Sequence, residues 1–342
     1  MGTMLVQRFA AREDVERIIG LDKEEMPEIL KGIEKLVYIH KNTNDAWESE
    51  VAGYKPDIVI HSAWQIRELY GNQKTGWAWN IDGSDRVFNF CFSNAFVERL
   101  VHFSTVASYG AYATNTIEQR FKETDPFRKS DYSYAEEKRV TEAHLEELYA
   151  KRINQNISVS IVRPAAITGP RGRFMRIRFG LQSTLSGQMR GAFIYRLISA
   201  MVAFVPVTPK WLRQFIHEDD VVGIVERLAF GERAGDYEAF NICPPGNVVL
   251  GKDMAKAVGK RTVPVYPWMV RIAFFVFWHL TRGKVPTGRG AWKGYSYPIA
   301  VDGSKVTNKL GYTYKYEGLD AFYYTDGLYA SFVPKELRRP KQ

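Results

Sequence analysis

Tyr134 and Lys138 are the two side chains whose types and spacing best suit acid–base chemistry. The segment Tyr132–Arg152 places apolar residues at three- and four-residue steps and is predicted to be a helix, so residues four apart share one face. A lysine ammonium held near a phenol favours the phenolate and lowers its pKa, which makes tyrosine a usable acid or base near neutral pH. A solvated helix face shows the same spacing by chance, so the pair alone is weak evidence.

Two hydroxyl side chains are predicted to lie at the end of a strand upstream of this helix. Ser104 ends the apolar run Leu100–Ser104, and Thr105 follows it directly. Ligands bind beyond the carboxyl ends of the strands in open α/β sheets, so these hydroxyls could meet a substrate. The competing interpretation of Thr105 is a hydroxyl that caps the next turn.

Alternating strands and helices are predicted to position these residues. Short β-branched runs bounded by chain breakers indicate buried parallel strands at Val15–Leu21, Lys35–Ile39, Asp57–His61, Leu100–Ser104 and Ile157–Val162. Segments with helical periodicity lie between them, at Leu5–Ala11, Asp45–Gly53, Thr75–Ser93 and Tyr132–Arg152. This alternation predicts an α/β fold with a doubly wound parallel sheet.

The pattern changes after Gly169, where bulky apolar residues and scattered prolines begin. A return to the sheet is predicted from a strand at Arg213–Ile216, a helix at Asp219–Phe230 and a strand at Glu238–Cys243. We therefore expect one domain from residues 1–170 plus about 211–243. A smaller, mostly helical domain is expected from about 171–210 plus 244–330, followed by a basic tail at 331–342.

Composition excludes some classes of protein. The chain has 342 residues, 45% of them hydrophobic, which is too apolar for a disordered protein. Its formal net charge of +9 suits nucleic acid, an anionic cofactor or an anionic membrane surface equally well. Two cysteines and no Cys/His cluster predict neither a disulfide framework nor a metal site. No apolar stretch is long enough to span a membrane, so we expect a soluble cytoplasmic protein.

Several motifs follow one another in a set order along the chain. They are Asp57–Ala63, Asn80–Ser84, Ser104–Gly110, the Tyr134/Lys138 pair, Arg163–Pro170 and Phe215–Val221. Together they resemble the extended short-chain dehydrogenase/reductase family, in its NAD-dependent epimerase/dehydratase group, over nearly the whole chain. The resemblance implies a Rossmann-like sheet that binds NAD and a smaller C-terminal substrate domain.

The same resemblance implies roles for individual residues. Tyr134 would move the proton of a substrate hydroxyl, Thr105 would hydrogen-bond the same oxygen, and Lys138 would hold the nicotinamide ribose. Cofactor contacts are expected from Gly2, Asp22, Asn42, Ala63, Asn80, Ser104, Tyr134, Lys138, Arg163 and Pro164. Substrate contacts are expected from Trp64, Ser108, Ala166, Arg173 and His217.

Asp22 is the residue that would choose between the two nicotinamide cofactors. A carboxylate at the end of the second family strand accepts hydrogen bonds from the adenine-ribose hydroxyls and repels a 2′-phosphate, so it favours NAD over NADP. A surface aspartate that opens a loop is the competing interpretation, because Lys23 follows it. Asn42 stands where the family usually has an aspartate near the adenine amine.

The chain differs from the family pattern at its first residues. The family begins with a strand and a glycine-rich loop that binds the pyrophosphate, and Gly2 aligns with the third glycine of that loop. The sequence allows two interpretations, a start site placed too late or a truncation that abolishes tight NAD binding. Either one predicts that the strands Val15–Leu21 and Asp57–His61 stand apart, with Gly2 opening the first helix beside them.

The substrate is the least constrained prediction. Ala166 stands where nucleotide-sugar enzymes of the family commonly have an asparagine, so Arg163–Pro170 is closer to hydroxysteroid-dehydrogenase-like members. The segment Trp268–His279 is apolar almost all round, and it could line a hydrophobic pocket, lie on a membrane surface or form a buried helix.

The function expected from these observations is hydride transfer at a secondary alcohol or ketone, on a hydrophobic, hydroxysteroid-like alcohol. The alternatives are a nucleotide-sugar epimerase or dehydratase, and a non-catalytic scaffold. We expect a small-molecule substrate and no nucleic-acid partner, and leave peripheral membrane contact and a homodimer open.

Overall fold

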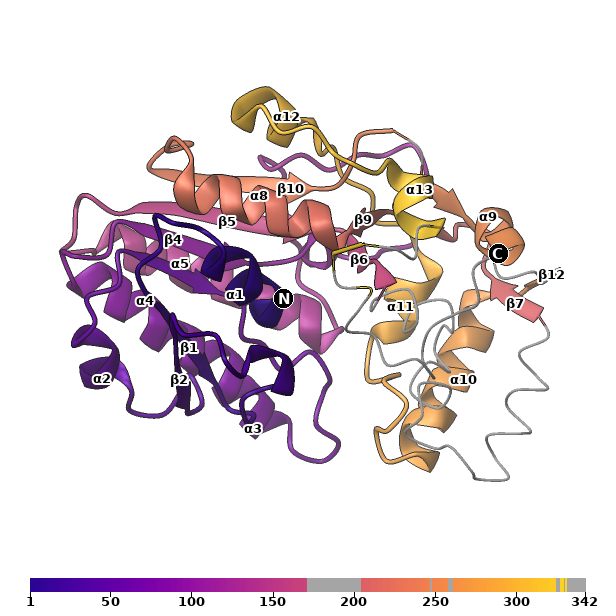
Figure 1. Ribbon diagram of the computed structural model, residues 1–342. Coiled ribbons are helices and arrows are strands. Elements are labelled where there is room, and N and C mark those ends of the chain that lie inside the picture. The colour runs from indigo at the N-terminus through magenta and orange to yellow at the C-terminus, as the bar shows by residue number, and fades with distance from the viewer. Residues whose placement is uncertain (171–203, 247, 258–260, 324–326, 329, 331–342) are drawn as a thin grey trace.

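A four-stranded parallel sheet organises the N-terminal part of the protein (Figure 1). The computed structural model describes residues 1–170, 204–246, 248–257, 261–323, 327–328 and 330. The sheet has the order β10-β5-β4-β3, from β3 (Ile58–His61), β4 (Arg99–Phe103), β5 (Ser158–Pro164) and β10 (Tyr237–Ile242). This confirms the predicted α/β fold with parallel strands.

Helices pack on both faces of this sheet because its strands alternate their apolar side chains. Val101 and Phe103 of β4 join a buried cluster with α1 (Gly2–Ala10) and α8 (Glu218–Phe230). Leu100 joins a second cluster on the other face, with α2 (Glu48–Ala52), α4 (Gly83–Ser93) and α5 (Ser133–Ala150). The alternation follows from the two-residue period of a strand.

The first two strands form a separate sheet. β1 (Ile18–Asp22) pairs in parallel with β2 (Leu36–His40), and β1 is not hydrogen-bonded to β3. The predicted separation of these strands is confirmed. Ile18 of β1 and Ile60 of β3 both pack against the cluster that contains Met4 and Leu5 of α1, so apolar side chains join the two sheets.

Two of the predicted boundaries differ in an informative way. β1 begins three residues later than predicted, because the residues before it form a turn held by the Arg12–Asp14 ion pair and by Lys35 Nζ, which donates to the Arg12 carbonyl. The predicted helix Thr75–Ser93 is divided into α3 (Gln73–Trp77), a π-helical turn at Ala78–Asp82 and α4. Such turns often occur at functional sites.

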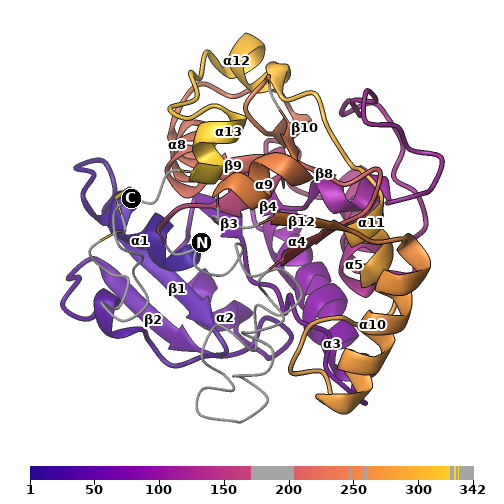
Figure 2. The ribbon, with the colours of Figure 1, turned by 90° about the vertical axis from the view of Figure 1, so that its right-hand side faces the viewer.

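The C-terminal part combines short strands with helices (Figure 2). Its helices are α9 (Gly251–Ala257), α10 (Pro267–Leu280), α11 (Ala291–Ser296), α12 (Ser304–Leu310) and α13 (Gly318–Tyr323). Its strand pairs are β6 (Ala166–Thr168) with β9 (Phe215–His217), β8 (Leu212–Arg213) with β11 (Val249–Leu250), and β7 (Phe204–Val207) with β12 (Arg261–Pro264). In the described residues, no helix has the length and apolar character needed to cross a membrane.

Candidate functional site

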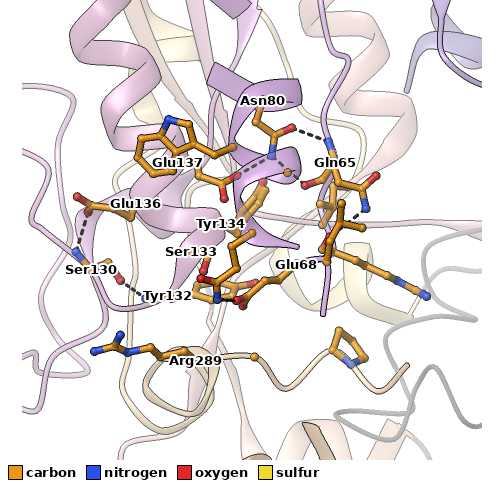
Figure 3. Close-up of a pocket in the computed structure, with 18 of the residues that line it drawn as sticks. Gln65, Glu68, Asn80, Ser130, Tyr132, Ser133, Tyr134, Glu136, Glu137 and Arg289 are labelled. Carbon is orange, nitrogen blue, oxygen red and sulfur yellow. Dashed lines mark hydrogen bonds between the residues drawn. The ribbon is translucent and has the colours of Figure 1, made fainter. Parts of the chain in front are cut away.

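A cavity of about 320 Å³ opens beside Tyr134, at the start of α5 (Figure 3). Three regions that are distant in the sequence form its walls. The first is the loop after β3 with α3 and the π-helical turn, the second is residues 130–137, and the third is the end of α10 with residues 286–289. Tyr134 therefore lies where the two parts of the protein meet, and its catalytic role stays a prediction.

An amide network forms one wall of this cavity. The Nδ2 of Asn80 donates to Glu137 Oε2 at 2.6 Å and to the carbonyl of Gln65 at 3.1 Å, while its Oδ1 accepts from the Gln65 amide at 2.8 Å (Figure 3). Asn80 is buried in the π-helical turn. It connects the loop after β3 to α5, so its side chain positions the cavity wall; cofactor contact by Asn80 stays a prediction.

Glu137 is a cavity residue that the sequence analysis did not single out. Burial raises its pKa, the hydrogen bond from Asn80 opposes that shift, and the carboxylate of Glu68, another lining residue, adds to it. The position of Glu137 beside Tyr134 could have been inferred from Tyr134-Ala-Glu-Glu-Lys138, because a residue three positions after Tyr134 lies on the same helix face. Arg289 and Trp278 also line the cavity, and their sequence distance from Tyr134 concealed them.

Lys138 is buried one turn beyond Tyr134. Its Nζ donates to the carbonyl of Phe103 at the end of β4 and lies 3.4 Å from the centre of the Trp64 indole ring. Burial lowers the pKa of Lys138 well below its ordinary value, while the indole face and the carbonyl favour the charged amine. In this conformation Trp64, a predicted substrate residue, covers the amine that is predicted to hold the cofactor ribose.

The predicted hydroxyl groups lie at the end of β4, against α5. The Thr105 side chain accepts a hydrogen bond from the Ala107 amide at 3.2 Å, so it caps the short helix Val106–Tyr109. Ser108 of that helix donates to the carbonyl of Ala135 at 3.0 Å and joins it to α5. Ser104 Oγ is buried without a hydrogen-bond partner among the described residues. In the cap the Thr105 oxygen is the acceptor, so the bond does not use its hydroxyl hydrogen. Thr105 can therefore cap this helix and still donate a hydrogen bond to a substrate, and both interpretations stay open.

Four of the predicted cofactor residues lie at the carboxyl ends of β1, β2 and β3 or beside them. Asp22 ends β1, is exposed, and accepts a hydrogen bond from the Glu24 amide at 3.0 Å. Asn42 follows β2 and Ala63 follows β3. Gly2 begins α1, and a Cβ on it would lie 3.7 Å from Ser62 Oγ, so α1 starts against the end of β3. Asp22 and Asn42 thus follow neighbouring parallel strands, and Gly2 lies beside the end of β3.

Arg163 lies in the interior at the end of β5. Its guanidinium pairs with Glu142 of α5 at 2.6 Å and donates to the Tyr109 hydroxyl at 2.9 Å. Burial opposes the charge on Arg163, but the Glu142 carboxylate outweighs it and raises the Arg163 pKa. Pro164 pairs with Ile242 of β10. Arg163 thus ties α5 to the sheet, and its contact with the cofactor stays a prediction.

Ala166 and His217, two more of the predicted substrate residues, do not line the cavity. Ala166 in β6 packs against the apolar cluster of the C-terminal part. His217 is fully buried at the end of β9, where its Nδ1 accepts a hydrogen bond from the Asp219 amide at 3.1 Å and caps α8. Arg173 lies outside the described residues.

Two buried histidines lie behind Lys138. His61 of β3 and His102 of β4 are register partners whose rings stack at 5.3 Å. The Nε2 of His61 is 2.8 Å from Ser84 Oγ, whereas neither nitrogen of His102 has a hydrogen-bond partner among the described residues. Burial, with the nearby charge of Lys138, lowers the pKa of His61 to about 3 and the pKa of His102 well below its ordinary value.

These histidines predict a loss of stability in acid. An unfolded histidine titrates near pH 6.5, so between pH 6.5 and about 3 the unfolded chain binds more protons than the folded one, and stability falls as pH falls. Each histidine contributes a slope of about 1.4 kcal/mol per pH unit. In urea unfolding between pH 7 and pH 5, His102→Leu should therefore make the free energy of unfolding depend less steeply on pH. A variant with the wild-type slope would show that His102 is not buried neutral.

Comparisons with known proteins identify related sequences. A family model described as the NAD dependent epimerase/dehydratase family matches residues 1–243. An uncharacterized protein of Mycobacterium tuberculosis is 24% identical over 331 residues, which cover 94% of this chain and 79% of that protein.

Similar folds occur among solved structures. The Bordetella bronchiseptica enzyme WbmG in complex with NAD and UDP has a TM-score of 0.63 at 22% identity, covering 94% of this chain and 87% of that chain. A UDP-glucose 4-epimerase of Thermus thermophilus in complex with NAD has a TM-score of 0.63 at 18% identity, covering 95% and 94%. These likenesses show a shared fold. With the family match over residues 1–243, they establish that the chain belongs to the NAD dependent epimerase/dehydratase family.

Proposed function

We propose that this protein is an NAD-linked enzyme that moves hydride at a carbinol carbon of a nucleotide sugar, with Tyr134 as the acid–base residue. The observation that carries the proposal is the polar cavity beside Tyr134. Charged and amide side chains make up nine of its twenty lining residues, namely Gln65, Arg67, Glu68, Gln73, Asn80, Asp131, Glu136, Glu137 and Arg289, beside apolar groups such as Trp77 and Trp278. Sugar hydroxyls can satisfy such groups, whereas an apolar alcohol would desolvate them without replacing their hydrogen bonds.

The same observation argues against the hydrophobic substrate expected from the sequence. The apolar residues of α10 are mostly exposed on its outer face, and Trp278 is the α10 side chain among the cavity residues. The fold comparisons support the polar substrate too, since WbmG was solved with UDP and MoeE5, at a TM-score of 0.64, with UDP-glucuronic acid. We therefore favour the nucleotide-sugar alternative over the substrate class expected first.

The residues at the strand ends fit a dinucleotide. The exposed carboxylate of Asp22 suits ribose hydroxyls, and the N-terminus of α1 offers its dipole to a phosphate. Ser104 Oγ and Trp64 Nε1 are buried without hydrogen-bond partners among the described residues, and such polar atoms suit a polar ligand. When bound, NAD supplies a hydride acceptor at C4 of the nicotinamide.

The protein's own groups would handle the proton. Tyr134 would accept the hydroxyl proton of the substrate as its carbinol becomes a carbonyl, and Thr105 would donate a hydrogen bond to the same oxygen. Lys138 can reach a ligand only if the Trp64 indole moves off its amine, because the ring centre lies 3.4 Å away. We therefore assign Trp64 a rearrangement on cofactor binding.

A panel of substrates tests the proposal. The protein is incubated with NAD and, in separate reactions, UDP-glucose, UDP-glucuronic acid or a sterol alcohol, and products are separated by chromatography. Conversion of a nucleotide sugar is the expected result. Conversion of the sterol alone would restore the hydrophobic substrate.

A non-catalytic scaffold is the second candidate, and the cover of Trp64 over Lys138 favours it. The scaffold interpretation predicts that NAD does not bind, because Trp64 keeps the Lys138 amine buried. Calorimetry with NAD separates the two candidates: heat that saturates with one NAD per chain supports the enzyme, and its absence supports the scaffold.

Cofactor choice gives a sharper prediction. Asp22→Asn should reduce the preference for NAD over NADP by roughly tenfold or more, because it removes a charged hydrogen-bond acceptor and the repulsion of a 2′-phosphate. Calorimetric titrations with both cofactors measure this preference. Glu25→Gln, which removes a nearby exposed carboxylate, is the matched control and should leave it unchanged. If the two substitutions changed the cofactor preference equally, Asp22 would act only as one of several surface charges and would not contact the ribose.

A further inference from the structure

Helix α10 carries an apolar stripe on its outer face. Its large side chains Trp268, Ile272, Phe275 and Leu280 are 55% to 71% exposed, and Met269 and Val276 are 40% and 49% exposed. These positions recur at steps of three and four residues, so they lie along one side of the helix. Exposed apolar side chains that are contiguous in this way mark an interaction surface.

The opposite face of α10 anchors it to the protein. Val270 and Phe274 pack in the apolar cluster of the C-terminal part, where the Phe274 ring lies 5.8 Å from the ring of Tyr295 in the neighbouring α11. The Thr287 hydroxyl donates to the Phe274 carbonyl at 2.8 Å. Figures 1 and 2 both place α10 at the periphery of the molecule. The helix is thus fixed with its apolar stripe outward.

The segment that carries the stripe has charges of a single sign in its sequence. Residues 261–301 contain six lysines and arginines and no aspartate or glutamate. Arg261, Arg271, Arg282, Lys284 and Arg289 are exposed, and Arg282 and Lys284 follow directly after the end of α10. A short amphipathic helix with an apolar stripe and basic flanks complements an anionic lipid surface, where the stripe enters the acyl boundary and the cations meet phosphate headgroups.

We propose that this protein docks peripherally on anionic membranes through the outer face of α10, with Arg282 and Lys284 at the headgroups. The helix lies in the plane of the interface and does not cross the bilayer. A second copy of this chain is the competing occupant of the stripe, but the exposed cations Arg282 and Lys284 beside it would repel their copies in a symmetric partner.

Flotation with vesicles tests the proposal on the full chain. Vesicles of phosphatidylcholine containing phosphatidylglycerol should carry the protein upward, and pure phosphatidylcholine should carry much less. The Ile272→Ser/Phe275→Ser variant should reduce partitioning about tenfold or more, because it removes two large apolar groups from the interface. Arg282→Gln and Lys284→Gln should each cost about fivefold on the anionic vesicles and little on the neutral ones.

Control variants separate membrane binding from misfolding and from self-association. Ile153→Ser removes an apolar side chain that is 78% exposed outside α10 and should leave partitioning unchanged. Circular dichroism checks that each variant is folded. Failure of the wild-type chain to float, or equal flotation of the Ile272→Ser/Phe275→Ser variant, overturns the proposal. A dimer in sedimentation equilibrium that the same variant disperses, without vesicle binding, assigns the stripe to a second copy.

Discussion

Tyr134→Phe is expected to lower turnover of a nucleotide-sugar substrate by roughly 10²- to 10⁴-fold, the usual contribution of a positioned acid–base group. The substitution removes one hydroxyl from the wall of the polar cavity and keeps the ring. NAD affinity should stay nearly unchanged, because the hydroxyl acts in proton transfer. Steady-state kinetics and calorimetry on the same preparation give the two quantities.

The matched control for this prediction lies on the same helix. Tyr149 is near the other end of α5, and its ring packs 4.7 Å from Tyr237 and 5.9 Å from Phe92, away from the cavity. Tyr149→Phe should leave turnover unchanged. Full activity of Tyr134→Phe would remove Tyr134 from the catalytic role, and a parallel loss of NAD affinity would make it a binding residue.

Arg163→Met is expected to destabilise the protein by roughly 3–5 kcal/mol, the usual cost of leaving a buried carboxylate without its partner. Both side chains of the Arg163–Glu142 pair are about a tenth exposed or less. The Tyr109 hydroxyl would lose a donor as well. Urea unfolding at neutral pH measures the change.

Two further variants show whether the buried pair is responsible. Combining Arg163→Met with Glu142→Met should recover part of the lost stability, because no charge is then left buried. Lys151→Met breaks the exposed ion pair with Glu147 at the end of α5 and should leave the unfolding midpoint unchanged. If Arg163→Met and Lys151→Met were equally mild, the Arg163–Glu142 pair would not hold α5 against the sheet.

Much of the fold was predictable because buried strands and helices space their apolar residues in recognisable patterns along the sequence. The run Ile58–His61 and the helix that carries Tyr134 and Lys138 were predicted within a few residues. The separation of β1 from β3 was also predictable, from the position of Gly2 in the motif. The start of β1 was not, because the ion pair and lysine contact that hold the preceding turn depend on tertiary structure.

The site was only partly predictable. The sequence indicated Tyr134, and the structure places it in the cavity wall. The hydrogen bond that Asn80 donates to Glu137 depends on a π-helical turn that has no clear pattern in the sequence. The stacking of Trp64 on Lys138 depends on the path of a loop. The helix at Trp268–His279 showed its apolar content in the sequence, but which face is exposed depends on its packing against α11.

The most direct test of Tyr134-assisted hydride transfer is a single-turnover measurement of nicotinamide reduction. The protein, preloaded with NAD, is mixed with UDP-glucose or UDP-glucuronic acid, either unlabelled or carrying deuterium at the reacting carbon, and the near-ultraviolet absorbance of reduced nicotinamide is followed. The proposal predicts a rise that deuterium slows and that Tyr134→Phe nearly abolishes. Saturating binding of both ligands without any reduced nicotinamide in the wild-type protein would contradict it.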